Sequence, residues 1–371
     1  MIKDKCDMVT TVILVSPSAP PVGGMTRWTE LIGSSLKSRE DIRLVYVNSS
    51  LGIPAQERSV PRIVFGTFGC VVKGVAALFR NRDSQNCVLH IATSGGKGFL
   101  RDYLLCRAAN LLNIPSCVHM HFGRIPSVLK SRSVESQLLD KVVQRASAIV
   151  TMDEFSKNAL NSIGVESVIN IPNPINQNEI PSYGGDKEKL IVFVGHVYKE
   201  KGIEVLLEAW KKLRMEKSDW KLEIIGPCEK AYREQLEFSV DGMDVSFEGE
   251  LDHESVIFRI LKSRILVLPS YSEGFPNVVL EAMACNAVVI GTEVGAIPEM
   301  LNYEKRLLVQ PGDSAALASA ILALIRNEAA MTDLARNMKD RVANLYSLDV
   351  VVDELKALWG SLSQREGAFV D

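Results

Sequence analysis

Short runs of β-branched and other apolar residues alternate with longer helical stretches along the whole chain. This alternation is typical of parallel sheets that helices cover on both faces. In the first half, strands are expected at 11–16, 42–47, 87–92, 116–120, 147–152 and 167–171. In the second half, they are expected at 189–194, 220–225, 244–248, 264–268 and 286–290. The pattern therefore predicts an α/β protein with two doubly wound units.

The chain of 371 residues is long enough for two such units, each with its own core. Segment 172–186 holds three prolines, two glycines and no periodicity, which is typical of a connection between domains. We therefore predict a first domain over 1–175, a linker over 176–187, a second domain over 188–348 and a C-terminal helical segment over 349–371. Open α/β sheets bind ligands beyond the carboxyl ends of their strands, so motifs that follow strands are the candidate site residues.

Charge is unevenly distributed along the chain. Residues 1–183 hold 20 Lys and Arg against 14 Asp and Glu, whereas residues 184–371 hold 22 against 31. A basic half can attract an anionic substrate or a membrane surface, although uneven charge is also common in proteins with neutral partners. Seven scattered cysteines without a C-x-x-C pair favour free thiols in a reducing compartment. With no export signal or membrane-length apolar run, we expect a cytoplasmic protein, or one at the inner face of the membrane.

The segment EGFPNVVLEAMA, residues 273–284, carries two carboxylates directly after an expected strand. Glu273 falls in a loop and Glu281 in a helix that is expected to begin near Pro276. This helix is apolar on nearly every side, so a carboxylate inside it needs a partner. One carboxylate can accept hydrogen bonds from both hydroxyls of a ribose, and free N–H groups at a helix start can hold a diphosphate. The alternative is a structural ion pair between Glu281 and an Arg or Lys.

Five motifs of the second half resemble, in the same order, family 4 of the retaining glycosyltransferases, which have the GT-B architecture. They are FVGHVYKEKG (193–202), EIIGP (223–227), VSFEGEL (245–251), LPSYSEGFPNVVLEAMACN (268–286) and EVGAIPE (293–299). The first half is more loosely similar, through PPVGGMTR (20–27), HIATSGG (90–96) and VHMHFG (118–123). The resemblance implies two facing Rossmann-like domains with a cleft between them, and a C-terminal helix that packs back on the first domain.

For the donor, the resemblance implies that Glu281 binds the ribose and that Glu273, a catalytic candidate, meets sugar hydroxyls. Lys201 resembles the family lysine that neutralises the donor phosphates, where a cation stabilises the charge on the leaving nucleotide. The alternative for Lys201 is a solvated lysine at a helix start. His196 stands where the family often has arginine, and a neutral imidazole supplies no permanent charge. Other implied donor contacts are Gly274, Phe275, Pro276 and Asn277, with Pro227 and Leu251 near the base.

In the first half, Gly23 and Gly24 follow the first strand and precede a helix expected to begin near Met25. Paired glycines allow close approach of an anion to a helix start, and in the family this place faces the donor phosphate. Alternation along the fourth strand sends His119 and His121 to one face. The resemblance makes His121 a catalytic candidate that hydrogen-bonds the sugar, while His119 and His90 are interpreted as structural. Acceptor contacts are expected at Ser94, Gly95 and Gly96.

No D-x-D triplet occurs, so the metal-diphosphate clamp of the other large glycosyltransferase fold is missing, and neither metal nor another cofactor is expected. P-loop, G-x-G-x-x-G and G-x-S-x-G motifs are also absent. The resemblance implies a metal-independent, retaining hexosyltransferase (EC 2.4) that uses a nucleotide-sugar donor and a carbohydrate or lipid-linked acceptor in bacterial surface polysaccharide or glycolipid biosynthesis, without nucleic acid. The alternatives are a nucleotide-sugar 2-epimerase of similar fold and a non-catalytic nucleotide-binding partner of a glycosyltransferase.

Segment 68–82, FGCVVKGVAALFRNR, sets apolar residues against Lys73, Arg80 and Arg82. Such a helix can contact anionic lipid or a lipid-diphosphate acceptor. The alternative is an ordinary amphipathic helix that packs on its own sheet.

Overall fold

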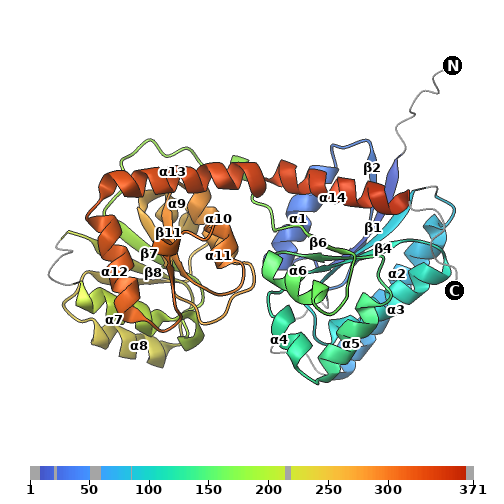
Figure 1. Ribbon diagram of the computed structural model, residues 1–371, viewed down its shortest axis with the longest axis horizontal. Coiled ribbons are helices and arrows are strands. Elements are labelled where there is room, and N and C mark those ends of the chain that lie inside the picture. Colours follow the sequence, from blue (N-terminus) through green and yellow to red (C-terminus); the bar gives the residue numbers. More distant parts are fainter. Residues whose placement is uncertain (1–8, 21–22, 51–59, 85, 214–218, 365–371) are drawn as a thin grey trace, which may run out of the picture. The chain divides into compact units, whose positions relative to one another are not determined.

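The computed structural model describes residues 9–20, 23–50, 60–84, 86–213 and 219–364. The chain divides into two compact units (Figure 1). The first comprises Met1–Pro174 and Leu348–Asp371, and the second comprises Ile175–Ser347. The chain therefore passes between the units twice, at 174/175 and at 347/348.

The first unit is built on a six-stranded parallel sheet with strand order β2-β1-β3-β4-β5-β6. Its strands are β1 (Thr10–Ser16), β2 (Ile42–Asn48), β3 (Cys87–Thr93), β4 (Ser116–Met120), β5 (Ala148–Thr151) and β6 (Val168–Asn170). Every residue of β1, β3, β4 and β5 is buried, as expected for strands covered on both faces. The six strands predicted for this half are confirmed, to within one residue at each end.

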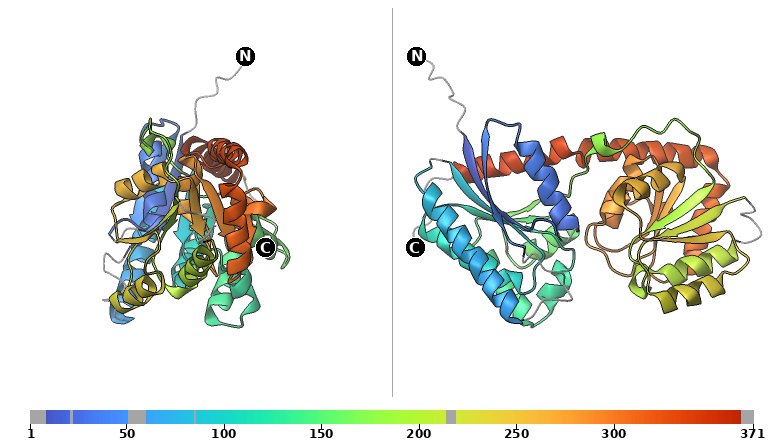
Figure 2. Two further views of the ribbon diagram at one scale, coloured as in Figure 1. Left: turned by 90° about the vertical axis from the view of Figure 1, so that its left-hand side faces the viewer. Right: turned by 180° about the vertical axis from the view of Figure 1, so that it is seen from behind.

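Helices cover both faces of this sheet, and Figure 2 shows the layers from two further sides. One face carries α2 (Val60–Asn81), α3 (Gly98–Leu111), α4 (Ile125–Lys130), α5 (Val134–Val143) and α6 (Glu154–Asn161), which contribute to a common core. The other face carries α1 (Gly24–Leu36) and the C-terminal helix α14 (Leu348–Ser363). The last helix of the chain thus completes the core of the first unit, with Trp359 fully buried.

The second unit has a six-stranded parallel sheet with strand order β12-β11-β10-β7-β8-β9. The strands are β7 (Leu190–Val194), β8 (Lys221–Ile225), β9 (Val245–Gly249), β10 (Ile265–Leu268), β11 (Val288–Thr292) and β12 (Leu308–Val309). The five predicted strands are confirmed to within two residues at each end. The two-residue edge strand β12 was not predicted, because its length carries no period.

The helices of the second unit flank its sheet and enclose a core around Trp210 and Phe193. They are α7 (Ile203–Lys212), α8 (Lys230–Ser239), α9 (His253–Lys262), α10 (Asn277–Ala284), α11 (Ile297–Met300), α12 (Ser314–Ile325) and α13 (Glu328–Leu345), with 3₁₀ turns η2 (Gln177–Glu179), η3 (Lys199–Lys201) and η4 (Lys305–Leu307). Within the described ranges, no single helix is long and apolar enough to span a membrane, and only α12 with α13, bent by 101° at their junction, reach that length and composition together.

Each sheet has one place where the order of the strands reverses. In the first sheet this switch point lies between β1 and β3, and in the second it lies between β7 and β10. Loops that leave two adjacent strands in opposite directions create a crevice at their carboxyl ends, where doubly wound proteins bind ligands. The fold therefore gives each unit one preferred place for a site.

Candidate active site

The loops that leave β7 and β10 meet at the switch point of the second unit. Lys201 closes η3 after β7, and Glu273 lies in the loop 269–276 after β10. The Nζ atom of Lys201 donates to Oε1 of Glu273 at 2.6 Å, and the Ser270 hydroxyl donates to the same oxygen at 2.6 Å. The side chains are only 21% and 10% exposed, so solvent screens this pair weakly. The structure thus joins two predicted site residues that are 72 positions apart.

Close backbone packing fixes the loop 269–276 against the start of α7. Gly202, between η3 and α7, has φ 72°, and a Cβ atom on it would lie 2.0 Å from the carbonyl oxygen of Pro269. Two backbone bonds hold the same loop, from Tyr271 N–H to the Glu200 carbonyl and from Ala296 N–H to the Gly274 carbonyl, both at 2.9 Å. Only glycine fits at position 202 without moving this loop.

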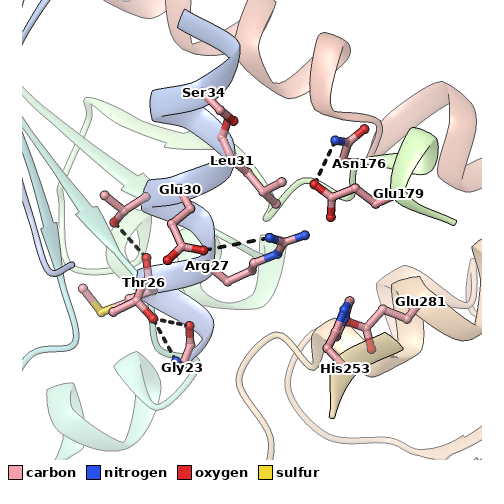
Figure 3. Close-up of polar contacts among 12 residues, drawn as sticks. Gly23, Thr26, Arg27, Glu30, Leu31, Ser34, Asn176, Glu179, His253 and Glu281 are labelled. Atoms are coloured by element: carbon pink, nitrogen blue, oxygen red, sulfur yellow. Dashed lines mark hydrogen bonds and ion pairs between the residues drawn. The ribbon is translucent and has the colours of Figure 1, made fainter. Parts of the chain in front are cut away.

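Glu281 lies on α10, which begins at Asn277 with Pro276 as its N-cap, so the predicted helix start is confirmed. As predicted, the helix is otherwise mostly buried. Oε1 of Glu281 pairs with Nε2 of His253, the first residue of α9, at 3.0 Å, and Figure 3 shows the two side chains next to each other. The carboxylate is 19% exposed and therefore remains open to a ligand. The expected partner of a structural Glu281 was an Arg or Lys, whereas the structure pairs it with a histidine.

A hollow of about 530 Å³ lies between the segments that follow β7 and β8. Two predicted donor residues line it, the exposed His196 and Pro227, together with Tyr198 and Tyr232. Gly226, at the end of β8, has φ 142°, and a Cβ atom there would lie 2.0 Å from the Gly195 carbonyl oxygen. The ends of β7 and β8 therefore lie in close backbone contact next to the hollow.

Three other predicted donor residues have different surroundings. Leu251, two residues after β9, packs against the core of the unit and does not belong to the described lining of the hollow. Phe275 packs on the same core, with its ring 6.1 Å from that of Tyr346. The Gly274 carbonyl is engaged by Ala296, as described above.

At the switch point of the first unit, the segment 94–96 follows β3. The backbone N–H of Gly96 donates to Oε1 of Glu135 at 2.7 Å, and Arg124 donates to the same oxygen at 2.6 Å. Arg124 also donates to the Ser94 carbonyl at 3.3 Å. Sequence reasoning missed both Arg124 and Glu135. Arg124 directly follows the motif VHMHFG and could have been considered, whereas no sequence signal marks Glu135.

Gly23 and Gly24 lie where α1 begins, as predicted. The N–H of Gly23 donates to Oγ1 of Thr26 at 2.8 Å, and that hydroxyl donates back to the Gly23 carbonyl at 2.9 Å (Figure 3). Gly23 has φ −174°, an extended conformation that any residue adopts, and a Cβ atom on it would meet no described atom within 4 Å. Among the described residues, the fold therefore imposes no steric requirement for glycine at 23.

A cluster of histidine and tryptophan rings lies behind this switch point. His119 and His121 are on one face of the sheet with ring centroids 4.1 Å apart, as their alternation predicted. Trp28 of α1 meets His121 at 4.7 Å and stacks on His90 at 5.6 Å. Nε1 of Trp359 donates to Nδ1 of His90 at 3.0 Å. This bond leaves Nδ1 of His90 as an acceptor and the proton of a neutral ring on Nε2.

Burial keeps the three histidines of this cluster uncharged. It lowers the pKa of His90 and that of His121 to about 3, and it lowers the pKa of His119 well below its ordinary value. The side chain of Asn173 opposes the shift in the pKa of His121. A neutral His121 can exchange hydrogen bonds with a ligand, but it brings no positive charge to the site.

The predicted residues therefore form two sets. In the second unit, Lys201 contacts Glu273, α10 carries Asn277 and Glu281, and His196 and Pro227 line the hollow. In the first unit, His121 lies beside the strand end from which Ser94, Gly95 and Gly96 continue, since its N–H donates to the Thr93 carbonyl at 2.8 Å. No group of three or more His, Cys, Asp and Glu side chains that could hold a metal ion occurs among the residues that the structure describes.

The second unit is similar in sequence to a known protein family. Residues 176–342 match the family model described as Glycosyl transferases group 1. The capsular polysaccharide biosynthesis glycosyltransferase CapM of Staphylococcus aureus is 31% identical over 187 residues, which are 48% of each chain. An uncharacterized glycosyltransferase of Methanocaldococcus jannaschii is 28% identical over 68% of this chain and 70% of its own. The chain thus spans about half the length of CapM.

Two solved structures share the fold over nearly the whole chain. Sucrose-phosphate synthase from Thermosynechococcus elongatus superposes with a TM-score of 0.72 at 20% identity, over 95% of this chain and 99% of that one. Anabaena HepE in complex with UDP superposes with a TM-score of 0.71 at 16% identity, over 95% and 100%. At these identities the likeness shows the fold, which is GT-B with its two Rossmann-like units.

Proposed function

We propose that this chain, whose second unit is a domain of the glycosyl transferases group 1 family, transfers a sugar from a nucleotide-sugar to an acceptor hydroxyl. The transfer retains the anomeric configuration and needs no metal ion. The second unit binds the donor and the first unit binds a carbohydrate or lipid-linked acceptor. CapM is named for capsular polysaccharide biosynthesis, and we propose a task of the same class, surface polysaccharide or glycolipid assembly, for this chain.

The observation that carries this proposal is the contact of Lys201 with Glu273 at the switch point of the second unit. A cation and a carboxylate are held there by adjoining loops, next to the helix that carries Glu281. A nucleotide-sugar needs these groups together, because its diphosphate requires positive charge and its ribose and sugar hydroxyls require acceptors. When a diphosphate binds, it offers Lys201 a doubly charged partner, which leaves Glu273 free to accept from the sugar.

Lys201 supplies the chemistry that a metal provides in other transferases. As the bond between the anomeric carbon and the diphosphate breaks, negative charge develops on the leaving oxygen, and a fixed ammonium group stabilises it. The neutral His121 of the first unit would exchange hydrogen bonds with the transferred sugar, without attacking it. In this scheme the departing phosphate takes the acceptor proton, on the same face of the sugar from which the nucleotide leaves.

The proposal is tested by incubating the protein with UDP-, GDP- and ADP-sugars, with and without simple glycoside acceptors, in the presence of a metal chelator. Product analysis should show release of one nucleotide and an acceptor glycoside of unchanged anomeric configuration. Lys201→Ala should lower the rate by about 100-fold or more, because one lost transition-state contact of this kind costs about 3–4 kcal/mol. Accumulation of an epimerised nucleotide-sugar without acceptor would replace the proposal with an epimerase. Absence of any turnover together with tight nucleotide binding would replace it with a non-catalytic binding role.

A further inference from the structure

The outer sides of α2 and α3 in the first unit expose a row of large apolar side chains. On α2 these are Phe68, Val72, Val75 and Phe79, spaced so that they follow one side of the helix. Phe68 is 67% exposed and Phe79 is 56% exposed. On the neighbouring α3, Leu100, Leu104 and Leu111 are exposed as well. We call these seven residues the α2–α3 face.

The other helices of this unit expose at most one large apolar side chain each within the described residues, Val134 on α5 and Phe155 on α6. The helices on the opposite side of the sheet, α1 and α14, are described in full and have no exposed large apolar side chain. The inner sides of α2 and α3 pack into the common core through Leu78, Phe99 and Leu105. The inner side of α2 therefore packs on its own sheet, as one interpretation of segment 68–82 expects, while its outer side is apolar and exposed.

Cations accompany the α2–α3 face. Lys73 and Arg80 of α2 and Arg107 of α3 are exposed, and within the part of the chain that the structure describes no carboxylate pairs with them. The sequence of α2 contains no acidic residue. Asp83, an acidic residue just after α2, pairs with Arg82 at 3.7 Å. The guanidinium of Arg82 also lies 4.1 Å from the ring centre of Phe79.

We propose that the α2–α3 face docks on an anionic phospholipid surface. Exposed aromatic and branched side chains insert at the boundary between headgroups and acyl chains, while adjacent cations attract the lipid phosphates. Long side chains such as Lys73 and Arg80 can reach the headgroup level while their methylene groups stay beside the apolar row. A protein partner would need acidic groups at positions that match these cations. The phosphates of an anionic membrane, in contrast, can pair with cations in any arrangement. This inference does not depend on the proposed enzyme activity.

The proposal is tested by sedimenting the full-length protein with vesicles of phosphatidylcholine, with or without phosphatidylglycerol. Binding should occur with the anionic vesicles, weaken as salt is raised, and be lost with neutral vesicles. Phe68→Ser with Phe79→Ser should abolish it, because the largest inserting groups are gone. Lys73→Ser with Arg80→Ser should lower the partition coefficient by about 25-fold, at about fivefold for each cation near an anionic surface.

A matched control comes from the second unit, where α8 carries Phe238, 86% exposed, and the exposed Lys230. The double variant Phe238→Ser with Lys230→Ser removes an exposed aromatic ring and an exposed cation from the second unit, and it should leave vesicle binding unchanged. The proposal would be overturned if this control lost vesicle binding as strongly as the variants of the α2–α3 face. It would also be overturned if the wild type bound neutral and anionic vesicles equally. A dimer in sedimentation velocity that Phe68→Ser with Phe79→Ser dissociates would overturn it as well, since the face would then bind a second copy. Unchanged melting temperatures of all variants show that each result reflects the surface.

Discussion

Replacing Gly202 with alanine should displace the loop 269–276, which carries Glu273. Alanine would have to keep φ at 72°, and its Cβ would lie 2.0 Å from a backbone oxygen of Pro269. A non-glycine residue in this conformation costs about 1–3 kcal/mol, and overpacking costs a further amount of about 1–3 kcal/mol. We therefore expect a loss of about 2–6 kcal/mol in the free energy of unfolding of this unit.

For a unit of this size, each kcal/mol corresponds to about 2–4 °C, so the melting temperature should fall by roughly 4–24 °C in differential scanning calorimetry. The displaced loop also separates Glu273 from Lys201, and a shift of about 1 Å can cost about 100-fold in kcat/KM. Gly33→Ala is the matched control, because Gly33 lies inside α1 and an added Cβ would meet no described atom within 4 Å. It should stabilise the protein by up to about 1 kcal/mol. A Gly202→Ala variant with the melting temperature and activity of the wild type would refute the predicted conflict with Pro269.

Three further predictions concern the described contacts. Trp359→Phe removes the donor to the buried Nδ1 of His90 and should destabilise the first unit by about 1–3 kcal/mol, measured by urea unfolding; equal stability would contradict this. The folded-state pKa values of His90 and His121, about 3, lie below the unfolded value near 6.5. Below about pH 6.5 the unfolded chain therefore binds more protons than the folded chain. The free energy of unfolding should fall as the pH is lowered, by up to about 1.4 kcal/mol per pH unit for each histidine. A free energy of unfolding that stays constant from about pH 7 to about pH 5 would contradict the burial of these rings. Glu281→Gln should weaken nucleotide binding at least about tenfold, since a hydrogen bond to a charged group contributes about 1.5–3 kcal/mol. His253→Ala should leave the nucleotide affinity, measured by isothermal titration calorimetry, unchanged.

The strands of both units could be predicted from the sequence, because parallel strands covered on both faces are continuous apolar runs. The start of α10 could be predicted too, since proline and the apolar run mark it. The edge strand β12 could not, because it contains only two residues and forms through pairing with β11. Element prediction therefore succeeded where local pattern and tertiary burial agree.

The sequence indicated which residues are candidates for the site, but it did not indicate most of the contacts between them. The motifs indicated Lys201 and Glu273 separately, but the bond between them arises from strand order, which places β7 beside β10. The histidine partner of Glu281 comes from a different helix and has no sequence signal. The donation from Trp359 to His90 joins residues 269 positions apart. These contacts depend on topology, which a single sequence does not disclose.

We propose that a nucleoside diphosphate binds at the ends of β7 and β10 through Lys201. Isothermal titration of the wild type with UDP, GDP and ADP, repeated with Lys201→Ala, tests this binding. Lys211→Ala is the control, since Lys211 is an exposed lysine in the last turn of α7. We predict that one nucleotide binds and that Lys201→Ala weakens its binding by about 10- to 150-fold, the equivalent of about 1.5–3 kcal/mol, while Lys211→Ala does not. Equal affinity of wild type and Lys201→Ala, or no binding to the folded wild type, would contradict the claim.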